Sequence, residues 1–335
     1  MKGTLAFTTI RNEGPFLLEW IAWQKMLGFE RVLVMFNDCT DHSPQMLRLL
    51  AKAGEIGIKR HHPTEGEHPQ PSAYRACRSH PYVKEATWMF TCDVDEFLVV
   101  HKGDGTIRTL LENGNVPWRG MGINWRIFGT NSHNRWEDGL VHRKFLRSSP
   151  SDVKQNSCVK SFVKDPLEFG MLRSHTPRFW NGQENWGSGG NYWVLSNGER
   201  WPIYNPDSTA RNATEQPDIV HGDASVHHYI LQTREQFEFK RGRLSAAEGL
   251  DRYNEDFFGR FNHNSTPNRD ALEHKARFDT EYARICAIPG VMRLHHLSCA
   301  DLVAEMCEKR GDDPKDDPRW QHHRTQAQSL PRQVT

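Results

Sequence analysis

Two aspartates separated by a single residue, in the segment Asp93-Val94-Asp95-Glu96, have the most specific chemistry in this sequence. They follow an apolar run, residues 87–92, that is typical of a strand. In an extended chain, the carboxylates of Asp93 and Asp95 point to the same side and Val94 points to the other. Two neighbouring carboxylates repel each other unless a cation or a proton lies between them, and oxygen ligands suit Mg²⁺ or Mn²⁺. The motif therefore predicts a divalent metal site that could neutralise a departing diphosphate; the alternative is a solvated acidic turn.

The elements that must position this motif alternate between strand and helix patterns. Such alternation predicts an α/β fold with a mostly parallel central sheet flanked by helices. Ligands bind to such sheets at the carboxyl ends of the strands, where the polar clusters of this sequence fall. The predicted strands are 5–10, 31–36, 55–60 and 87–92, and the predicted helices are 16–27, 43–53 and 72–85, the last broken at Pro81.

The pattern changes after about residue 118. Short strand-like runs at 121–128, 140–145, 157–163 and 225–231 are separated by long loops, above all over 176–222, and helical patterns return at 233–243 and 269–286. Long loops in compact enzymes often cover a ligand. We therefore expect one half over 1–118, a mixed, loop-rich half of the same domain over 119–310, and a flexible tail over 311–335, because that end is polar and interrupted by prolines.

Composition excludes several classes of protein. Lys and Arg number 43 and Asp and Glu 42, so a formal charge of +1 gives no overall attraction to nucleic acid. The seven cysteines are scattered without a Cys-x-x-Cys pair, which indicates reduced thiols and neither disulfides nor a zinc site. We find no signal peptide and no apolar run of the ~18 residues that span a bilayer. The prediction is a cytoplasmic protein, with peripheral contact at the inner face of the membrane left open.

Five short motifs follow one another in the first hundred residues: Arg11-Asn12-Glu13, Glu19-Trp20-Ile21, Gly28-Phe29, Asn37-Asp38-Cys39-Thr40-Asp41 and Asp93 to Leu98. In this order and spacing they resemble the GT-A-fold glycosyltransferases, most closely a bacterial branch of the family 2 type, over roughly residues 4–100. A looser resemblance continues at Phe128-Gly129-Thr130 with His133, at His228-Tyr229 and at Lys240-Arg241-Gly242.

The resemblance implies a Rossmann-like GT-A fold and an enzyme that moves a sugar from a nucleotide-diphosphate sugar, a UDP-sugar first of all, to a carbohydrate or glycolipid acceptor. It implies that residues 1–118 are the half that binds the nucleotide-sugar donor and that residues 119–310 are the acceptor-side half. It also implies an Mn²⁺ or Mg²⁺ cofactor and an inverting reaction, as in polysaccharide biosynthesis. For Asn12 and Asp41, capping of a helix N-terminus is an equally good interpretation. The expected donor contacts are Arg11, Asn12, Glu13, Asn37, Asp38, Asp41, Gln70, Asp93 and Lys160, with Arg75 as a further option.

By the same resemblance, His228 would be the third metal ligand beside Asp93 and Asp95. A histidine in a strand is alternatively a hydrogen-bonded core residue. Inverting transfer needs a carboxylate base, for which Glu184 in a Trp-rich loop and Asp223 fit by position, with Glu137 and Asp138 as further options. Arg143, Lys160, Lys240 and Arg241 are candidates to contact the diphosphate.

Two rival functions fit parts of the sequence. Eighteen histidines and many acidic residues could build a metal-dependent phosphohydrolase, although the histidine pairs are adjacent in sequence and adjacent side chains diverge. The second rival function is that of a catalytically inactive module that binds a sugar or a nucleotide. The intact Asp93 and Asp95 argue against it. Metal-dependent nucleotide-sugar binding would separate the three.

Overall fold

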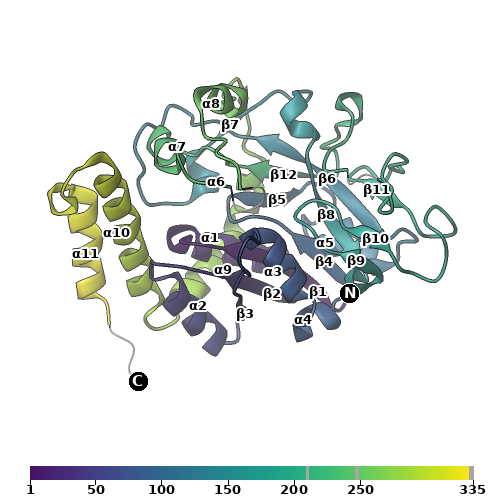
Figure 1. Ribbon diagram of the computed structural model, residues 1–335, viewed down its shortest axis with the longest axis horizontal. Helices are drawn as coiled ribbons and strands as arrows, with labels where there is room; N and C mark the ends of the chain where they lie inside the picture. The colour runs from purple at the N-terminus through teal and green to yellow at the C-terminus, as the bar shows by residue number, and fades with distance from the viewer. Residues whose placement is uncertain (209–210, 246–248, 332–335) are drawn as a thin grey trace.

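A central mixed sheet organises the computed structural model, which describes residues 1–208, 211–245 and 249–331 (Figure 1). Its strand order is β3-β2-β1-β4-β8-β6-β12-β5, and β11 pairs with β6 beside this path. The strands are β1 Thr4–Ile10, β2 Arg31–Phe36, β3 Gly57–Arg60, β4 Trp88–Thr91, β5 Glu96–Val100, β6 Gly120–Ile127, β8 Val159–Lys164, β11 Trp193–Leu195 and β12 Ala224–His228. Two small antiparallel pairs complete the strands: β9 Phe169–Met171 with β10 Arg178–Trp180, and β7 Arg147–Ser148 with β13 Thr266–Pro267.

The first four strands of the sheet are parallel. β1 pairs in parallel with β2 and β4, and β2 pairs in parallel with β3. β8 then runs antiparallel between β4 and β6, and β12 is parallel to β6 but antiparallel to β5. β1 and β2 are buried almost throughout, as expected for parallel strands covered on both faces. The predicted α/β class with a mostly parallel sheet is confirmed.

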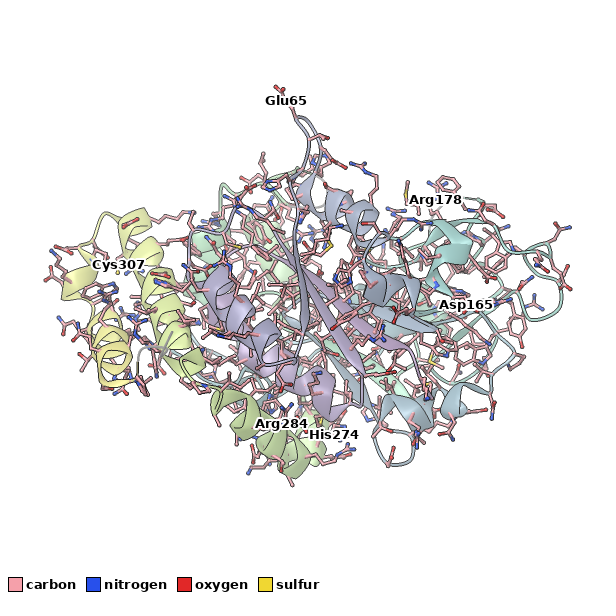
Figure 2. The ribbon with its side chains drawn as sticks, turned by 90° about the horizontal axis from the view of Figure 1, so that it is seen from below. Glu65, Asp165, Arg178, His274, Arg284 and Cys307 are labelled. Atoms are coloured by element: carbon pink, nitrogen blue, oxygen red, sulfur yellow. The ribbon has the colours of Figure 1, made fainter. Side chains whose placement is uncertain are left out.

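Helices pack against the sheet, and a helical hairpin lies at one end of the molecule (Figure 1). α9 and α10 pack against α1, and α11 lies beside α10 as an antiparallel hairpin (Figure 1). In the view of Figure 2, Cys307 marks this hairpin end, and Glu65 marks a projecting loop between β3 and α3. The α-helices are α1 Gly14–Met26, α2 Ser43–Lys52, α3 Pro69–Cys77, α4 Pro81–Lys84, α5 Ile107–Leu110, α6 Val141–Lys144, α7 Arg234–Lys240, α8 Glu255–Phe261, α9 Lys275–Cys286, α10 Val291–Arg310 and α11 Pro318–Ser329. Within the described ranges, no helix is both long and apolar enough to cross a membrane.

The segment 140–145 is helical, so its prediction as a strand is wrong. The buried carboxylate of Glu19 accepts hydrogen bonds from the backbone N–H groups of Val141 (2.8 Å) and His142 (3.1 Å). These N–H groups open α6, and an acceptor there satisfies donors that a short helix leaves free. A contact 122 residues away in sequence therefore decides the local structure.

The prediction of a flexible tail from residue 311 is also wrong for the described residues. Asp317 accepts a hydrogen bond from the N–H of Arg319 (2.9 Å), and Pro318 occupies the first turn of α11. An aspartate cap followed by proline is a favourable helix start, so the prolines that suggested disorder begin helical turns instead. His323 and Ala327 of α11 are buried. Residues 332–335 lie outside the described part.

Candidate active site

A cavity of about 1570 Å³ opens at the carboxyl ends of β1, β2 and β4. Arg11, Asn12 and Glu13 reach it from the end of β1, Asn37 from the end of β2, and residues 93–95 from the end of β4. These polar clusters therefore lie at the ends of the strands, as predicted. Helix α3, the segment 170–175 and residues between α7 and α8 supply much of the remaining wall.

The acidic motif forms a turn, whereas the sequence argument assumed an extended chain. The carbonyl oxygen of Asp93 accepts a hydrogen bond from the N–H of Glu96 (3.1 Å), which closes the turn. Val94 is packed in the core, and Asp93 and Asp95 both line the cavity. Val94 also borders the cavity, so the structure does not show the predicted separation of Val94 from the two carboxylates.

Lys160 anchors the turn from beneath. Its fully buried ammonium lies 3.0 Å from Asp93 Oδ2 and 2.9 Å from Glu96 Oε2. Burial alone would lower the pKa of Lys160, but the charges of Asp93 and Glu96 hold it above its ordinary value, so this lysine is charged. Lys160 does not line the cavity, and its expected contact with donor phosphate is replaced by this ion cluster. Gln70 donates to the second oxygen of Asp93 (3.1 Å).

Asp95 faces His228 at the end of β12. The imidazole Nε2 is 3.7 Å from Asp95 Oδ1, and the ring of Trp125 packs on the histidine with centroids 4.3 Å apart. Burial acts to raise the pKa of Asp95, but His228, Lys240 and Lys160 outweigh it and hold that pKa below its ordinary value. The buried Nδ1 of His228 has no hydrogen-bond partner. Asp95 is therefore an ionised carboxylate beside an imidazole at the cavity wall.

The predicted metal ligands meet the requirements of a shared ion only in part. Two ligands about 2.1 Å from one ion are at most about 4.2 Å apart, a limit that the 3.7 Å separation of Asp95 and His228 satisfies. Asp93 is different, because Lys160 and Gln70 occupy its two oxygens. Asp95 and His228 could hold a divalent cation with substrate phosphates as further ligands, and Asp93 could join them by exchanging a partner.

The cavity wall is cationic. Among its described lining residues there are eight cationic side chains and five acidic side chains. Burial acts to lower the pKa of Lys240, but Tyr253 and Asp95 outweigh it and hold that pKa above its ordinary value, so the ammonium is retained. Such a wall suits a diphosphate, which carries several negative charges. The cationic residues are Arg11, Arg75, Arg78, Arg173, Arg178, Lys240, Arg243 and Arg252.

Glu13 is a carboxyl group held in its neutral form at neutral pH. Burial is the largest cause and Asp95, Asp41 and Asp93 add to it, whereas Lys240 opposes it; together they raise the pKa of Glu13 from 4.5 to about 8. A protonated carboxyl at a cavity wall can donate a hydrogen bond to a ligand oxygen. The residue lies where donor contact was predicted.

Asn12 and Asp41 are tied up in local structure. Asn12 adopts a left-handed φ of 58°, accepts from the N–H of Thr40 (2.8 Å) and donates to its hydroxyl (2.7 Å). Asp41 accepts from the N–H of Gly14 (3.1 Å) at the start of α1 and from Ser43 at the start of α2. The capping interpretation holds for Asp41, and Asn12 joins the two strand-to-helix turns while lining the cavity.

Several predicted residues lie outside the cavity wall. Asp38 receives a hydrogen bond from Asn37 (3.0 Å), and neither Asp38 nor Asp41 lines the cavity. Arg143 pairs with Asp279, and Arg241 pairs with Glu238 and Glu255. These arginines are therefore not among the residues that could meet a diphosphate there.

The carboxylates proposed as the base are also elsewhere. Glu184 belongs to a loop whose tryptophans pack on one another, and Asp223 lies beside Lys102 at the start of β12. Asp138 contacts His295 on α10, and Glu137 precedes it. None of these four carboxylates lines the cavity. For Glu184 the reason is that the tryptophans of its loop pack into a separate apolar cluster.

Other cavity residues were missed by the sequence argument. His175 donates its Nδ1–H to the carbonyl oxygen of Val159 (2.8 Å), and burial lowers its pKa to about 3, so the ring is neutral. Glu305 comes from α10, where it contacts Asn12 (3.2 Å) and Arg243 (3.1 Å). Both come from segments far from the motifs along the chain. No local pattern around them points to a ligand.

Comparison with protein families gives one match. The model of glycosyltransferase family 92 matches residues 7–187, which include every element that forms the acidic turn and its lysine anchor. This match bears neither on the predicted family 2 branch nor on its motif pattern. No curated protein sequence matches the chain.

Solved structures give distant similarities. The first 349 residues of S. aureus TarS in complex with UDP-GlcNAc have 11% identity and a TM-score of 0.32, with 98% of this chain and 93% of that chain covered. Another S. aureus TarS crystal structure has 11% identity and a TM-score of 0.27. The match covers 49% of this chain and only 28% of the TarS chain. HddC from Yersinia pseudotuberculosis has 8% identity and a TM-score of 0.29, with 58% and 90% covered. Similarities at this level carry no argument about activity.

Proposed function

Because the chain belongs to glycosyltransferase family 92, we propose that it transfers a sugar from a nucleotide-diphosphate sugar to a carbohydrate or glycolipid acceptor. UDP-sugars are the donors we propose to test first. The observation that carries the proposal is the cationic cavity at the carboxyl ends of β1, β2 and β4. His228 and the ionised carboxylate of Asp95 lie next to each other on its wall. A nucleotide and its diphosphate fit a cavity of this size and charge.

Each part of the wall has a proposed task. Asp95 and His228 would hold Mn²⁺ or Mg²⁺, and the ion would neutralise the diphosphate as the bond to the sugar breaks. Lys160 fixes the turn that presents Asp95, because it binds Asp93 and Glu96 at once. Lys240 and the arginines of the wall would attract and orient the phosphates. The neutral Glu13 would donate a hydrogen bond to a donor oxygen.

We also propose that the transfer inverts the configuration of the sugar. This requires a base near the acceptor hydroxyl, and it must come from a group that lines the cavity. The anomeric configuration of the product, read by nuclear magnetic resonance from the coupling of the anomeric proton, tests inversion independently of donor identity.

The central experiment is a thermal-shift screen of UDP-sugars with and without Mn²⁺, followed by measurement of UDP release. A donor that binds the folded state raises the melting temperature by mass action. We expect Asp95→Asn and His228→Ala to lose the Mn²⁺-dependent part of the shift. Asp38→Asn, an exposed carboxylate outside the wall, should respond like the wild type.

Different outcomes distinguish the alternatives. A shift that is the same in Asp95→Asn and the wild type would contradict the metal assignment. Phosphate release from phosphoesters without sugar transfer would favour a phosphohydrolase. Glycan binding that ignores both nucleotide and Mn²⁺ would favour an inactive binding module.

A further inference from the structure

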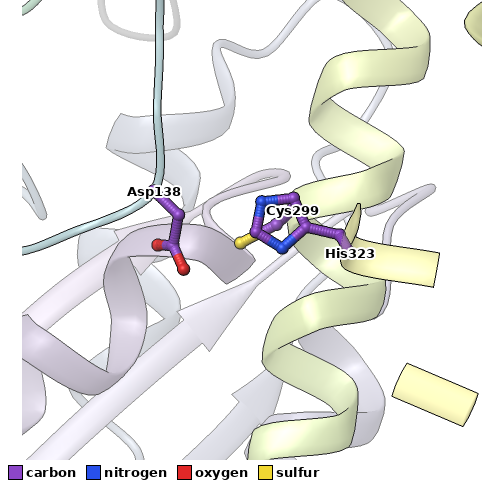
Figure 3. Close-up of side chains that lie close together, drawn as sticks. All are labelled: Asp138, Cys299 and His323. Atoms are coloured by element: carbon purple, nitrogen blue, oxygen red, sulfur yellow. The ribbon is translucent and has the colours of Figure 1, made fainter. Parts of the chain in front are cut away.

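A second set of metal-ligating side chains lies away from the cavity, where α10 and α11 meet the segment before α6. Asp138, Cys299 and His323 each present a ligand atom, and these three atoms all lie within 4.8 Å of one another (Figure 3). Over the residues that the structure describes, no other set of three or more His, Cys, Asp or Glu side chains meets this criterion. Cys299 and His323 are buried, and Asp138 opens to solvent.

Further imidazoles surround these three residues. His295 lies one helical turn before Cys299 on α10, and its Nε2 is 3.0 Å from Asp138 Oδ2 and 3.6 Å from Cys299 Sγ. The buried Nδ1 of His295 has no hydrogen-bond partner. The Nδ1 atoms of His296 and His323 are 3.0 Å apart. Oxygen, sulfur and nitrogen ligands thus converge from three segments that are remote in sequence.

We propose that Asp138, His295, Cys299 and His323 bind a zinc ion. Zinc takes four ligands of these types at about 2.0–2.3 Å in a tetrahedron, whose corners are then roughly 3.3–3.8 Å apart. Asp138, Cys299 and His323 have ligand atoms within 4.8 Å of one another, and His295 Nε2 is 3.0 Å from Asp138 and 3.6 Å from Cys299. Among the described residues no set that includes His295 is as compact as those three, so the side chains must move closer together to reach this geometry. Small side-chain rotations complete it. Four protein ligands leave no open position, so the ion is structural.

The chemistry of the ligands fits such an ion. Zinc binds cysteine as a thiolate, so the Cys299 thiol, whose Sγ lies 3.6 Å from His295 Nε2, must give up its proton. Binding forms a Zn–S bond and releases that proton to solvent. The aspartate is already positioned, since Asp138 Oδ1 accepts from the N–H of Gly139 (2.8 Å) and its carbonyl accepts from Lys144 (3.0 Å). Its exposure provides the path by which zinc enters.

The sequence argument against a zinc site looked for a Cys-x-x-Cys pair, which this cluster does not need. His295 and Cys299 are four residues apart and therefore on one face of α10. The ion would join that face to α11 through His323 and to the segment before α6 through Asp138. Because α10 also carries Glu305 at the cavity wall, zinc would fix the position of a cavity residue.

The test uses the full chain, loaded with zinc sulfate and then passed through a desalting column. We expect about one zinc per chain by elemental analysis, a higher melting temperature than after chelation, and a thiolate-to-metal absorption band when Co²⁺ replaces zinc. Cys299→Ser and His323→Gln should each bind zinc at least about tenfold more weakly. His322→Ala, an exposed neighbour, is the matched control and should retain the metal.

The proposal is overturned if the wild type retains no zinc, or if Cys299→Ser retains as much as the wild type. Asp138→Asn provides a variant at a partly solvated position should the buried substitutions prevent folding, and it too must lose zinc. Asp95→Asn separates this site from the cavity, because zinc at the cluster should survive that change. A chain that binds zinc but transfers no sugar would contradict the proposed function alone.

Discussion

Lys160 shows how a single buried residue orders the acidic turn. It is the shared partner of Asp93 and Glu96, and neither its side chain nor that of Glu96 is exposed. Removing one partner from a buried ion pair typically costs 3–5 kcal/mol, because the remaining charge has neither water nor a counter-ion. The lysine would therefore act on the proposed donor binding through the shape of the turn, although it does not reach the cavity.

Glu13 allows a prediction about pH. Its pKa is about 8 in the folded state and 4.5 ordinarily, so between these values the unfolded chain releases a proton that the folded chain keeps. The folded state binds more protons, and the free energy of unfolding must therefore fall as pH rises from about 4.5 to 8. Glu13→Gln cannot ionise, so it should gain about 1–2 kcal/mol relative to the wild type between pH 5 and pH 8.5, with allowance for solvent at the wall.

Urea denaturation of both proteins at the two pH values measures this difference. Asp38→Asn, at an exposed position, controls for a general effect of losing a carboxylate and should show no such trend. A constant difference between Glu13→Gln and the wild type across the range would show that Glu13 keeps its ordinary pKa.

At the scale of elements, α11 distinguishes a packed helix from a mobile tail. Ala327 is 2% exposed and belongs to the main apolar core, whereas its neighbour Gln328 is exposed. Ala327→Asp would bury a charge and should lower the free energy of unfolding by about 2 kcal/mol or more. Gln328→Asp should change it by less than about 0.5 kcal/mol. Equal effects of the two substitutions, measured by urea denaturation, would mean that α11 does not pack on α10.

The elements predicted correctly are those whose local pattern matches their burial. β1 and β2 are apolar runs because parallel strands are covered on both faces. α10 was not predicted, because it packs against α1, α2 and α11 and buries polar residues such as His295 and Ser298 among apolar ones. Helices buried on several sides lack the clean polar face that sequence reading relies on.

The candidate site could be predicted only where it follows strand ends. Asp93, Asp95, Glu13 and Asn37 reach the cavity as the alternating pattern indicated. Glu184 does not, because Trp180 and Trp186 pack together (centroids 5.4 Å apart) and keep their loop at a distance from the cavity. Such tertiary packing leaves no mark in a local window of sequence.

At the scale of the whole molecule, charge is distributed unevenly. The formal charge of the chain is +1, but the described cavity wall has eight cationic side chains and five acidic ones, of which Glu13 is neutral at neutral pH. Attraction between such a wall and a diphosphate is screened by salt. We expect the dissociation constant for UDP, measured by calorimetry, to rise several-fold between about 0.05 and 0.5 M NaCl. Uridine, which lacks the phosphates, should bind with little salt dependence; equal dependence for both would place the phosphates away from the cationic wall.

α10 belongs to two neighbourhoods at once. Along one side it pairs with α11, and through Glu305 it braces Asn12, Thr40 and Arg243 at the mouth of the cavity. Because α10 is one continuous helix, a displacement of the hairpin of α10 and α11 would be transmitted to the turn after β1. The last helices therefore support the end of the molecule that holds the cavity, and truncating them would weaken that end even though they lie beyond the sheet.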